Sequence, residues 1–202
     1  LGFSCDTSAP MLCAMTEEAS TKDRLVQAAT RLFRQRGYDG TGLSEILAEA
    51  GVPKGSLYHH FPEGKADLAC AAADWTAGEI VRVIDDSFRD APDWRHGVTT
   101  FCYKMAKLFD ILNSADACPI FGLMFDGPDQ TRFRIHAEAA FTRIIAGAAH
   151  YAHTLGMPPD TAHDMAETFI IGFQGGWTLA RVRRNSDVLR SLPARLYGPA
   201  SA

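Results

Sequence analysis

The sequence predicts an all-α protein in which three short helices precede a larger helical part. Apolar residues recur at three- and four-residue steps through most of the 202-residue chain, which is the spacing of helices that bury one face. Sustained alternation of apolar and polar residues, the pattern of strands, is missing from the sequence. Glycine or proline stands at many of the points where one apolar pattern ends and the next begins.

The first predicted helix covers residues 22–36 and the second covers residues 43–50. The apolar face of the first carries Leu25, Ala28, Ala29, Leu32 and Phe33. Ser20 lies three residues before Asp23, the spacing of a capping box at a helix start. Gly37 and Gly51 follow the two patterns, and glycine is the residue that most often ends a helix.

The third predicted helix begins at Pro53 and ends at His60. A segment of this length is not stable alone in water, so we expect Leu57 and Phe61, one turn apart, to hold it by packing. With the second helix and the turn at Gly51 it forms a helix-turn-helix pattern. The outward positions are then Lys54, Gly55, Ser56, Tyr58 and His59, whereas His60 is expected to pack against the first helix.

Longer helices are predicted for the rest of the chain. The apolar patterns indicate helices at residues 65–86, 94–113, 131–155 and 160–184, and a final short helix at 187–196. The segment CPIFGLMF (118–125) is predicted to be a short apolar helix or a turn. We therefore divide the chain into a flexible N-terminal arm (1–21), a helix-turn-helix domain (22–66) and a larger helical domain (67–202).

The formal net charge of −4 is unevenly distributed along the chain. Residues 22–65 hold seven Lys and Arg against five Asp and Glu, whereas residues 1–21 hold three acids and no Lys or Arg. A small basic segment attached to an acidic remainder favours a polyanionic partner at one end of the molecule.

The outward positions of the third helix have the chemistry of a nucleic-acid contact. Lys54 can reach guanine acceptors or phosphate, and Gly55 permits close approach of the backbone. The hydroxyl groups of Ser56 and Tyr58 can donate to phosphate. Lys65 begins the next helix, where its ammonium group and the backbone N–H groups together can hold one phosphate. An ordinary solvated helix face is the alternative interpretation.

Residues 22–68 resemble the DNA-binding domain of the TetR family of bacterial transcriptional regulators. The likeness rests on the run AATRLFRQRGYDGTGLSEILAEAGVPKGSLYHHFPEGKADL. Its most specific parts are an aromatic residue near the end of the first helix before a glycine, then Thr41, then Gly51-Val52 followed by KGSLYHHF. The form HHFPEGK, together with ACPIFGLMFD and GGWTLARVRRNSDVLR, is similar to the LmrA/YxaF-like branch.

The resemblance implies specific DNA contacts. Thr41, Tyr58 and Lys65 are implied to contact phosphates. The positions implied to face bases, or the backbone near them, are Lys54, Gly55, Ser56 and His59. Two departures from the family pattern are Gly42, where a Ser or Thr cap is common, and Pro53, where a Ser often caps the recognition helix.

The resemblance also implies a function for the whole chain. It implies a ligand-responsive regulator, more in keeping with a repressor than with an activator, that a small and mainly apolar or aromatic effector releases from a palindromic operator in double-stranded DNA. The larger domain is then expected to bind the effector and to form a homodimer. We expect the dimer to form through residues 131–155 and 160–184, whose small residues let helices of two subunits approach closely.

The larger domain contains many aromatic and methionine residues, which commonly line ligand pockets. The candidates for effector binding are Phe101, Met105, Phe121, Met124, Phe125, Phe173 and Trp177. The few polar residues nearby are Tyr103, Gln174 and Thr178, which predicts a mainly apolar ligand. Ordinary core packing is the alternative for any one of these residues.

Other functional classes have weaker support in the sequence. The motifs GxSxG, GxxxxGK[ST] and GxGxxG after a strand are missing, so we expect no catalytic residue and no cofactor. His150 and His153, joined at most by His163, lack a clear third ligand, and no metal site is predicted. A helical metal- or small-molecule-binding protein or enzyme without a DNA function, and a helical module that binds a protein partner, are the alternatives.

The sequence also favours one cellular compartment. No uncharged stretch reaches the length needed to span a bilayer, and the first 21 residues lack the positive region of a secretory signal. The five cysteines are odd in number and show no CxxC spacing, which favours a reducing compartment over a disulfide framework. We therefore expect a cytoplasmic protein without a membrane partner.

Overall fold

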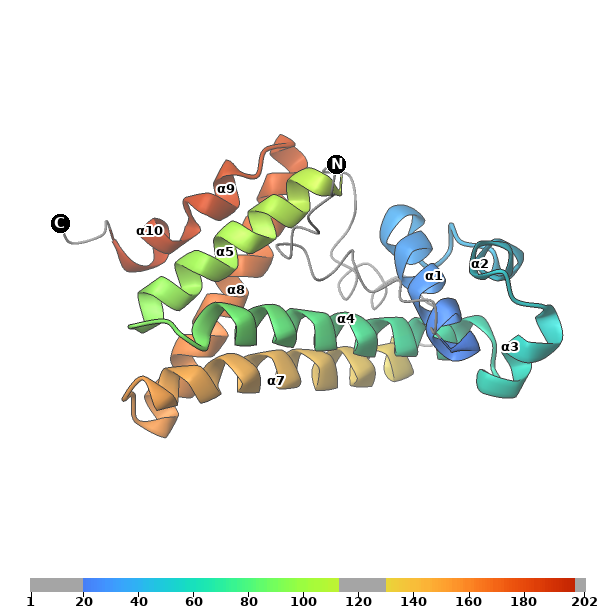
Figure 1. Cartoon of the computed structure of the whole chain (residues 1–202), viewed down its shortest axis with the longest axis horizontal. Coiled ribbons are helices and arrows are strands. Elements are labelled where there is room, and N and C mark those ends of the chain that lie inside the picture. The colour runs from blue at the N-terminus through green and yellow to red at the C-terminus, as the bar shows by residue number, and fades with distance from the viewer. Residues whose placement is uncertain (1–19, 113–129, 199–202) are drawn as a thin grey trace, which may run out of the picture.

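The computed structural model describes residues 20–112 and 130–198, and within these ranges every regular element is a helix (Figure 1). The helices are α1 (Thr21–Arg36), α2 (Leu43–Ala50), α3 (Lys54–His60), α4 (Lys65–Phe88), α5 (Trp94–Ile111), α7 (Gln130–Thr154), α8 (Pro159–Arg183), α9 (Asp187–Arg190) and α10 (Leu192–Tyr197). The predicted all-α fold is confirmed. Nearly all of the predicted arm (1–21) and the whole segment 118–125 lie outside the described residues.

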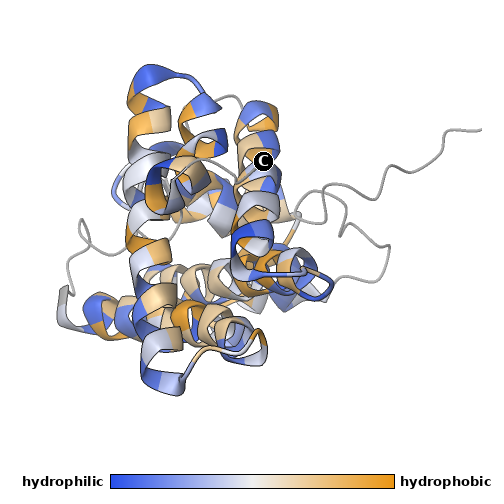
Figure 2. Ribbon diagram, turned by 90° about the vertical axis from the view of Figure 1, so that its left-hand side faces the viewer, coloured by the Kyte–Doolittle hydropathy of each residue, from blue (hydrophilic) through white to orange (hydrophobic). Residues whose placement is uncertain are grey.

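The first three helices gather at one end of the molecule, beside the beginning of α4 (Figure 1). From there α4 runs through the larger domain with α7 alongside it, and α8 packs against α7. Helix α5 packs on α4, while α9 and α10 contact both α5 and α8. Polar and apolar residues alternate along the ribbons in Figure 2 because each helix buries only one stripe of side chains. None of the described helices is both long and apolar enough to cross a membrane.

Local capping explains where the helices of the N-terminal domain begin and end. The Ser20 hydroxyl accepts a hydrogen bond from the Asp23 N–H at 3.1 Å, and the Asp23 carboxylate accepts one from the Ser20 N–H at 3.3 Å. This pair is the predicted capping box. At the start of α2 the Glu45 carboxylate accepts from the Gly42 N–H at 2.9 Å, so α2 is capped although Gly42 has no side chain. Gly51 ends α2 in the left-handed conformation, with φ of 62°.

The prediction of a single final helix at 187–196 is wrong. The structure has two short helices there, α9 and α10, which are separated at Ser191. Pro193 lies in the first turn of α10. Because proline has no N–H to donate to the carbonyl four residues earlier, at Leu189, the hydrogen-bond ladder is interrupted.

Several small residues of α7 are buried within one chain, and one of them faces α4. Ala148 and Ala152 are fully buried, and a methyl group added at Gly147 would lie 3.5 Å from the Val81 side chain. We expected this run to let two subunits approach each other. In the structure Gly147 lets α7 approach α4 closely, and a contact between subunits through residues 131–155 and 160–184 stays a prediction.

The core of the larger domain is aromatic. Phe101 and Phe169 are fully buried, and their rings meet edge to face with centroids 5.2 Å apart. Cys70 and Cys102 are buried free thiols. Burial raises the pKa of Cys102 to about 12, so this thiol stays protonated and acts as a small apolar core residue, as predicted.

Replacing Gly97 with alanine should lower the free energy of unfolding by about 1–3 kcal/mol, because the added methyl group would overlap the Phe88 ring. The matched control is Gly78→Ala in α4, where the methyl group would meet no atom within 4 Å outside its own helix. That change should raise the free energy of unfolding by up to about 1 kcal/mol, because alanine favours the helical conformation more than glycine does. Chemical denaturation measures both changes. A Gly97→Ala protein as stable as wild type would contradict the close packing of α4 on α5.

Candidate nucleic-acid interface

The short helix α3 is held in place by two apolar side chains. Leu57 is fully buried and Phe61 is 4% exposed. The Phe61 N–H donates to the Leu57 carbonyl at 2.8 Å and closes the helix. The structure therefore confirms both predicted anchors. The helix begins at Lys54, one residue later than predicted, because Pro53 adopts an extended conformation with ψ of 149°.

The opposite face of α3 is open to solvent. Lys54, Gly55, Tyr58 and His59 are exposed, and Ser56 is half-buried. A methyl group added at Gly55 would meet no neighbouring atom within 4 Å. The backbone at Gly55 is therefore accessible to a closely approaching partner, as the sequence analysis expects.

His60 is exposed as well, which differs from the expected packing against α1. Its ring lies edge to face with the His59 ring, with centroids 5.0 Å apart. The chain leaves the helix at Phe61 (φ −136°), so Phe61 rather than His60 fills the space next to the core. Two imidazole rings therefore lie at the exposed end of α3.

The turn between α2 and α3 is fixed by backbone hydrogen bonds. The Gly51 N–H donates to the Ala48 carbonyl at 3.2 Å, and the Val52 N–H donates to the Leu47 carbonyl at 3.1 Å. The Val52 side chain is buried. Local geometry thus sets the angle between the two helices, as a helix-turn-helix motif requires.

Tyr58 lies against the start of α4. Gly64 is in a positive-φ conformation, with φ of 66°, and its N–H donates to the Phe61 carbonyl at 2.9 Å. A methyl group added at Gly64 would lie 3.5 Å from Cε1 of Tyr58. The tyrosine is 45% exposed, so it lies on the surface beside the first turn of α4, where backbone N–H groups lack helical partners.

The Lys65 ammonium group is held against an aromatic ring. Its Nζ atom lies 4.2 Å from the centroid of the Tyr38 ring, which is a cation–π contact. Burial lowers the pKa of Lys65, and the Asp39 carboxylate opposes this shift. A phosphate contact would require the lysine to leave the Tyr38 ring, so this contact stays a prediction.

Thr41 is buried in the turn between α1 and α2. It is 1% exposed, and its hydroxyl donates to the Gly37 carbonyl at 2.8 Å. In this conformation the side chain stabilises the turn. A phosphate contact by Thr41 would need the turn to open, and it also stays a prediction.

Two ion pairs offset the acidic residues of α2. Arg31 pairs with Glu49 at 2.7 Å, and Arg36 pairs with Glu45 at 2.6 Å. Hydrogen bonds from the Gly42 N–H and from Arg36 lower the pKa of Glu45. These carboxylates therefore add little net negative charge beside the outward face of α3.

The helix-turn-helix domain is tied to the larger domain at the start of α4. Arg132, near the start of α7, pairs with both Glu63 and Asp67. Burial raises the pKa of Asp67, but hydrogen bonds from Arg132 and from the Glu63 N–H outweigh it and hold the pKa below its usual value. Phe133 is fully buried, with its ring centroid 5.2 Å from that of Tyr38. We call these five residues the α4–α7 clamp.

The sequence does not predict the clamp. Arg132 and Asp67 are 65 positions apart, and no local pattern links them. The one available signal was Tyr38, an aromatic residue directly after the glycine that ends α1.

Known proteins with the same helix-turn-helix and larger helical domain identify the family. Residues 25–72 match the family described as "Bacterial regulatory proteins, tetR family". The HTH-type transcriptional regulator Rv0196 of Mycobacterium tuberculosis is 32% identical over 173 residues, which cover 81% of this chain and 86% of Rv0196. The chain belongs to the TetR family. It is therefore a DNA-binding transcriptional regulator, and its relatives are regulators rather than enzymes.

The branch within the TetR family also agrees with the sequence analysis. Residues 95–194 match the "Transcriptional regulator LmrA/YxaF-like, C-terminal domain". YxaF of Bacillus subtilis is 37% identical over 106 residues, a match that covers 52% of this chain and about half of YxaF (56%). A TetR regulatory protein from Rhodobacter sphaeroides has the same fold, with a TM-score of 0.72, 26% identity, and coverage of 88% of this chain and 97% of that one. A TetR transcriptional regulator from Legionella pneumophila also has this fold, with a TM-score of 0.73 and 22% identity. The match covers 90% of this chain and 97% of that one.

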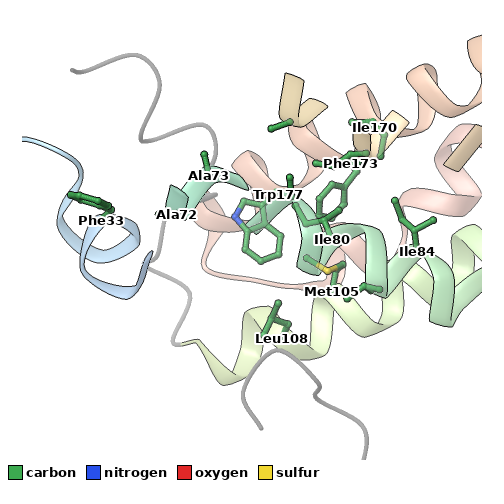
Figure 3. Close-up of a cluster of buried hydrophobic side chains, with 14 of the residues drawn as sticks. Phe33, Ala72, Ala73, Ile80, Ile84, Met105, Leu108, Ile170, Phe173 and Trp177 are labelled. Carbon is green, nitrogen blue, oxygen red and sulfur yellow. The ribbon is translucent and has the colours of Figure 1, made fainter. Parts of the chain in front are cut away.

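Four of the seven predicted effector-binding residues of this TetR-family protein are described, and they lie together between α5 and α8. The ring centroids of Phe101 and Phe173 are 5.0 Å apart, and those of Phe173 and Trp177 are 5.9 Å apart. Met105 lies beside them (Figure 3). The remaining three, Phe121, Met124 and Phe125, lie outside the described residues.

The three histidines considered for a metal site each have different surroundings. Among the described residues, no group of three His, Cys, Asp or Glu side chains is placed to hold a metal ion. The His150 ring lies edge to face with Tyr151. Nδ1 of His153 lies 2.9 Å from the Met157 carbonyl oxygen, and His163 is exposed.

Replacing Lys54 with alanine, or Tyr58 with phenylalanine, should weaken binding to a duplex that the wild-type protein selects from a random pool. Lys54→Ala removes a positive charge from the exposed face. The slope of log K against the logarithm of the salt concentration should therefore fall in magnitude by about 1. Tyr58→Phe removes one hydroxyl, which should cost about 1 kcal/mol, or roughly fivefold in affinity. Fluorescence anisotropy across a salt series measures both effects.

The matched control for Lys54→Ala is Lys107→Ala, which removes the same charge from an exposed position on α5. Its affinity and salt dependence should equal those of wild type. Wild-type affinity in both α3 variants would contradict the assignment of this face to DNA.

Proposed function

We propose that this TetR-family protein is a homodimeric repressor that a small, mainly apolar effector releases from a palindromic operator. The observation that carries the proposal is the exposed face of α3, whose outward positions are Lys54, Gly55, Ser56, Tyr58 and His59. A lysine, hydroxyl groups and an open backbone suit the major groove and its phosphates. On this proposal α3 is the recognition helix, and the protein acts in the cytoplasm, where the operator lies.

The second subunit is proposed to dock on the outer face of α8. Three large apolar residues are exposed there: Ile171 (67%), Leu179 (46%) and Val182 (77%). Their spacing places them on one side of the helix. Beside them is a groove of about 280 Å³, lined by residues of α8, α9 and α10 that include Gly172 and Gly175. The glycines leave room for a helix of the second subunit, and contact would remove the exposed apolar residues from water.

A dimer is physically necessary for tight operator binding by this motif. One copy of α3 can read only one half of a palindrome. A two-fold symmetric pair presents two recognition helices about 34–36 Å apart, which matches successive major grooves on one side of the duplex. A monomer would lose half of the contacts and the selection for spacing.

The α4–α7 clamp supports release by a ligand. The clamp joins the first turns of α7 to the residues directly after α3, so a ligand that moves α7 relative to α4 also changes the orientation of α3. Such a ligand acts only through its different affinity for the two conformations. A hundredfold release of operator requires a difference of about 2.7 kcal/mol.

Val182→Glu should convert the dimer into a monomer, because it places a charge in the apolar face of α8. At 77% exposure this position should tolerate the change without unfolding the monomer. The control is Tyr103→Glu, at a position that is 62% exposed on α5, which should stay dimeric. Light scattering after size-exclusion chromatography measures the mass of each protein.

The same variants test repression. On a template whose promoter overlaps the selected duplex, wild type and Tyr103→Glu should reduce transcription, and Val182→Glu should not. A monomeric variant that still represses would refute the dimeric mechanism, and a wild-type protein that leaves transcription unchanged would refute repression.

Arg132→Met should loosen the start of α4, because it removes the cation shared by Glu63 and Asp67. Hydrogen exchange at residues 61–70 should then accelerate roughly fivefold, corresponding to about 1 kcal/mol for ion pairs of this kind. The matched control is Arg134→Met on the same helix, where the arginine pairs with the exposed Glu138. Equal exchange rates in the two variants would show that Arg132 does not hold the domains together.

A further inference from the structure

We infer that the indole N–H of Trp177 is the polar contact of the effector site, and that the effector is an aromatic molecule carrying a hydrogen-bond-accepting oxygen. The inference rests on the proposed ligand response and specifies its chemistry. It begins from one donor group that the fold buries without satisfying.

The Trp177 donor has no partner in the part of the chain that the structure describes. The side chain is 5% exposed, and its Nε1 atom is buried with no hydrogen-bond acceptor in reach. Buried N–H groups in folded proteins are almost always paired, because burial without a partner costs the hydration that is lost. Trp94 shows the usual arrangement in the same protein, since its Nε1 donates to the Tyr197 hydroxyl at 3.0 Å.

The surroundings of Trp177 explain why no side chain supplies the acceptor. Its ring meets Phe109 edge to face at 5.4 Å and Phe173 at 5.9 Å, centroid to centroid. Ile80, Met105 and Leu108 lie around it in Figure 3. None of these side chains carries an oxygen atom. Since none of these described neighbours supplies the acceptor, we assign it to a molecule that enters this apolar cluster.

Figure 3 also shows which edge of the indole is available. The nitrogen-bearing edge is turned away from Phe173, Ile80 and Met105. Of the polar residues that the sequence placed nearby, Tyr103 is 62% exposed, and the Thr178 hydroxyl donates to the Gln174 backbone carbonyl at 3.0 Å. The Trp177 indole N–H is thus a buried donor of this cluster without a partner among the described residues.

Helix α8 meets α5 mainly through side chains. The backbone of α8 approaches α7, α9 and α10 more closely than it approaches α4 or α5. On the side of α5 the contact is made by large aromatic side chains, Phe101 and Phe109 with Phe173 and Trp177. Side chains can change rotamer to admit a flat molecule, whereas closely packed helix backbones cannot. A planar aromatic ligand fits such a cluster by adding another edge-to-face contact, and its oxygen then accepts from Trp177.

The test uses two probes of the same shape. 2-Acetylnaphthalene carries a carbonyl oxygen where 2-isopropenylnaphthalene carries a CH₂ group, so the pair differs in the acceptor alone. The full chain is labelled with ¹⁵N at its three tryptophans, and the indole signals are assigned with the variants Trp75→Phe, Trp94→Phe and Trp177→Phe. Each probe is titrated while the indole ¹H–¹⁵N signals are followed.

Before any probe is added, the Trp177 indole proton should resonate upfield of the hydrogen-bonded Trp94 proton. The ketone should move the Trp177 proton downfield and leave Trp94 in place. It should also bind about tenfold or more tightly than the hydrocarbon, as expected for one buried hydrogen bond. In Trp177→Phe this preference should fall to about threefold or less.

Several results would overturn the inference. A Trp177 proton that is already downfield without probe would show that the protein itself supplies an acceptor. Equal affinity for the two probes, no binding of either probe, or an undiminished preference in Trp177→Phe would each reject the site. The wild-type titration decides the matter even if Trp177→Phe fails to fold.

Anisotropy with the selected duplex on the same samples separates this inference from the proposed function. Retained DNA binding together with no discrimination between the probes rejects the Trp177 site alone. Failure to bind any duplex rejects the proposed function instead.

Discussion

The packing of Leu57 and Phe61 is the constraint on which the rest of the structure depends. A seven-residue helix does not persist in water by itself, so α3 exists only because these two side chains are buried. Their burial uses one face of α3, and the residues on the opposite face are not needed to hold the helix in place. The outward residues can therefore be chosen for their chemistry, and the orientation in which α3 presents them is decided by α1 and α2 beneath it.

The beginning of α4 transmits that orientation to the rest of the molecule. Gly64 makes the turn from α3 with a positive φ and leaves space for the Tyr58 ring. Within the next few residues, Lys65 lies over Tyr38 and Asp67 pairs with Arg132. The tyrosine proposed to face DNA, the lysine and the attachment of α7 thus meet within about one helical turn. Any shift of α7 along or around α4 acts directly on the residues next to α3.

Sequence patterns predict this fold well where the deciding interactions are local. Three features lie within a few residues of the structure that they determine. They are the capping box of Ser20 and Asp23, the glycine that ends α2, and the two anchors one turn apart that hold α3. Patterns of this kind identified the long helices to within about two residues at their ends. The final helix was predicted wrongly because the apolar pattern continues through Ser191, although Pro193 removes a donor that one continuous helix needs.

Long-range contacts could not be predicted in the same way, and neither could the helix against which a given side chain packs. Nothing near Arg132 in the sequence indicates Asp67, because the contact is created by the side-by-side packing of α4 and α7, which run in the same direction. Small residues in α7 suit a close approach to any helix, and only the structure shows that Gly147 faces Val81. The aromatic residues between α5 and α8 were predicted from composition. That Trp177 has no acceptor among the described residues becomes visible only when its neighbours are known.

The strength of the α4–α7 clamp suits a switch. Its pair with Glu63 is exposed to water and contributes at most about 1 kcal/mol, while the more sheltered pair with Asp67 and the Tyr38–Phe133 contact each add an amount of similar order. The total is comparable with the roughly 2.7 kcal/mol that a hundredfold change in operator affinity requires. A much stronger clamp would hold one orientation against any small ligand, because the ligand's difference in affinity could not overcome it. A much weaker clamp would let α3 move independently of the larger domain, and binding there would not affect the operator. For the proposed ligand response, the two ion pairs and one aromatic contact therefore lie in the range where a ligand of modest affinity would shift the equilibrium.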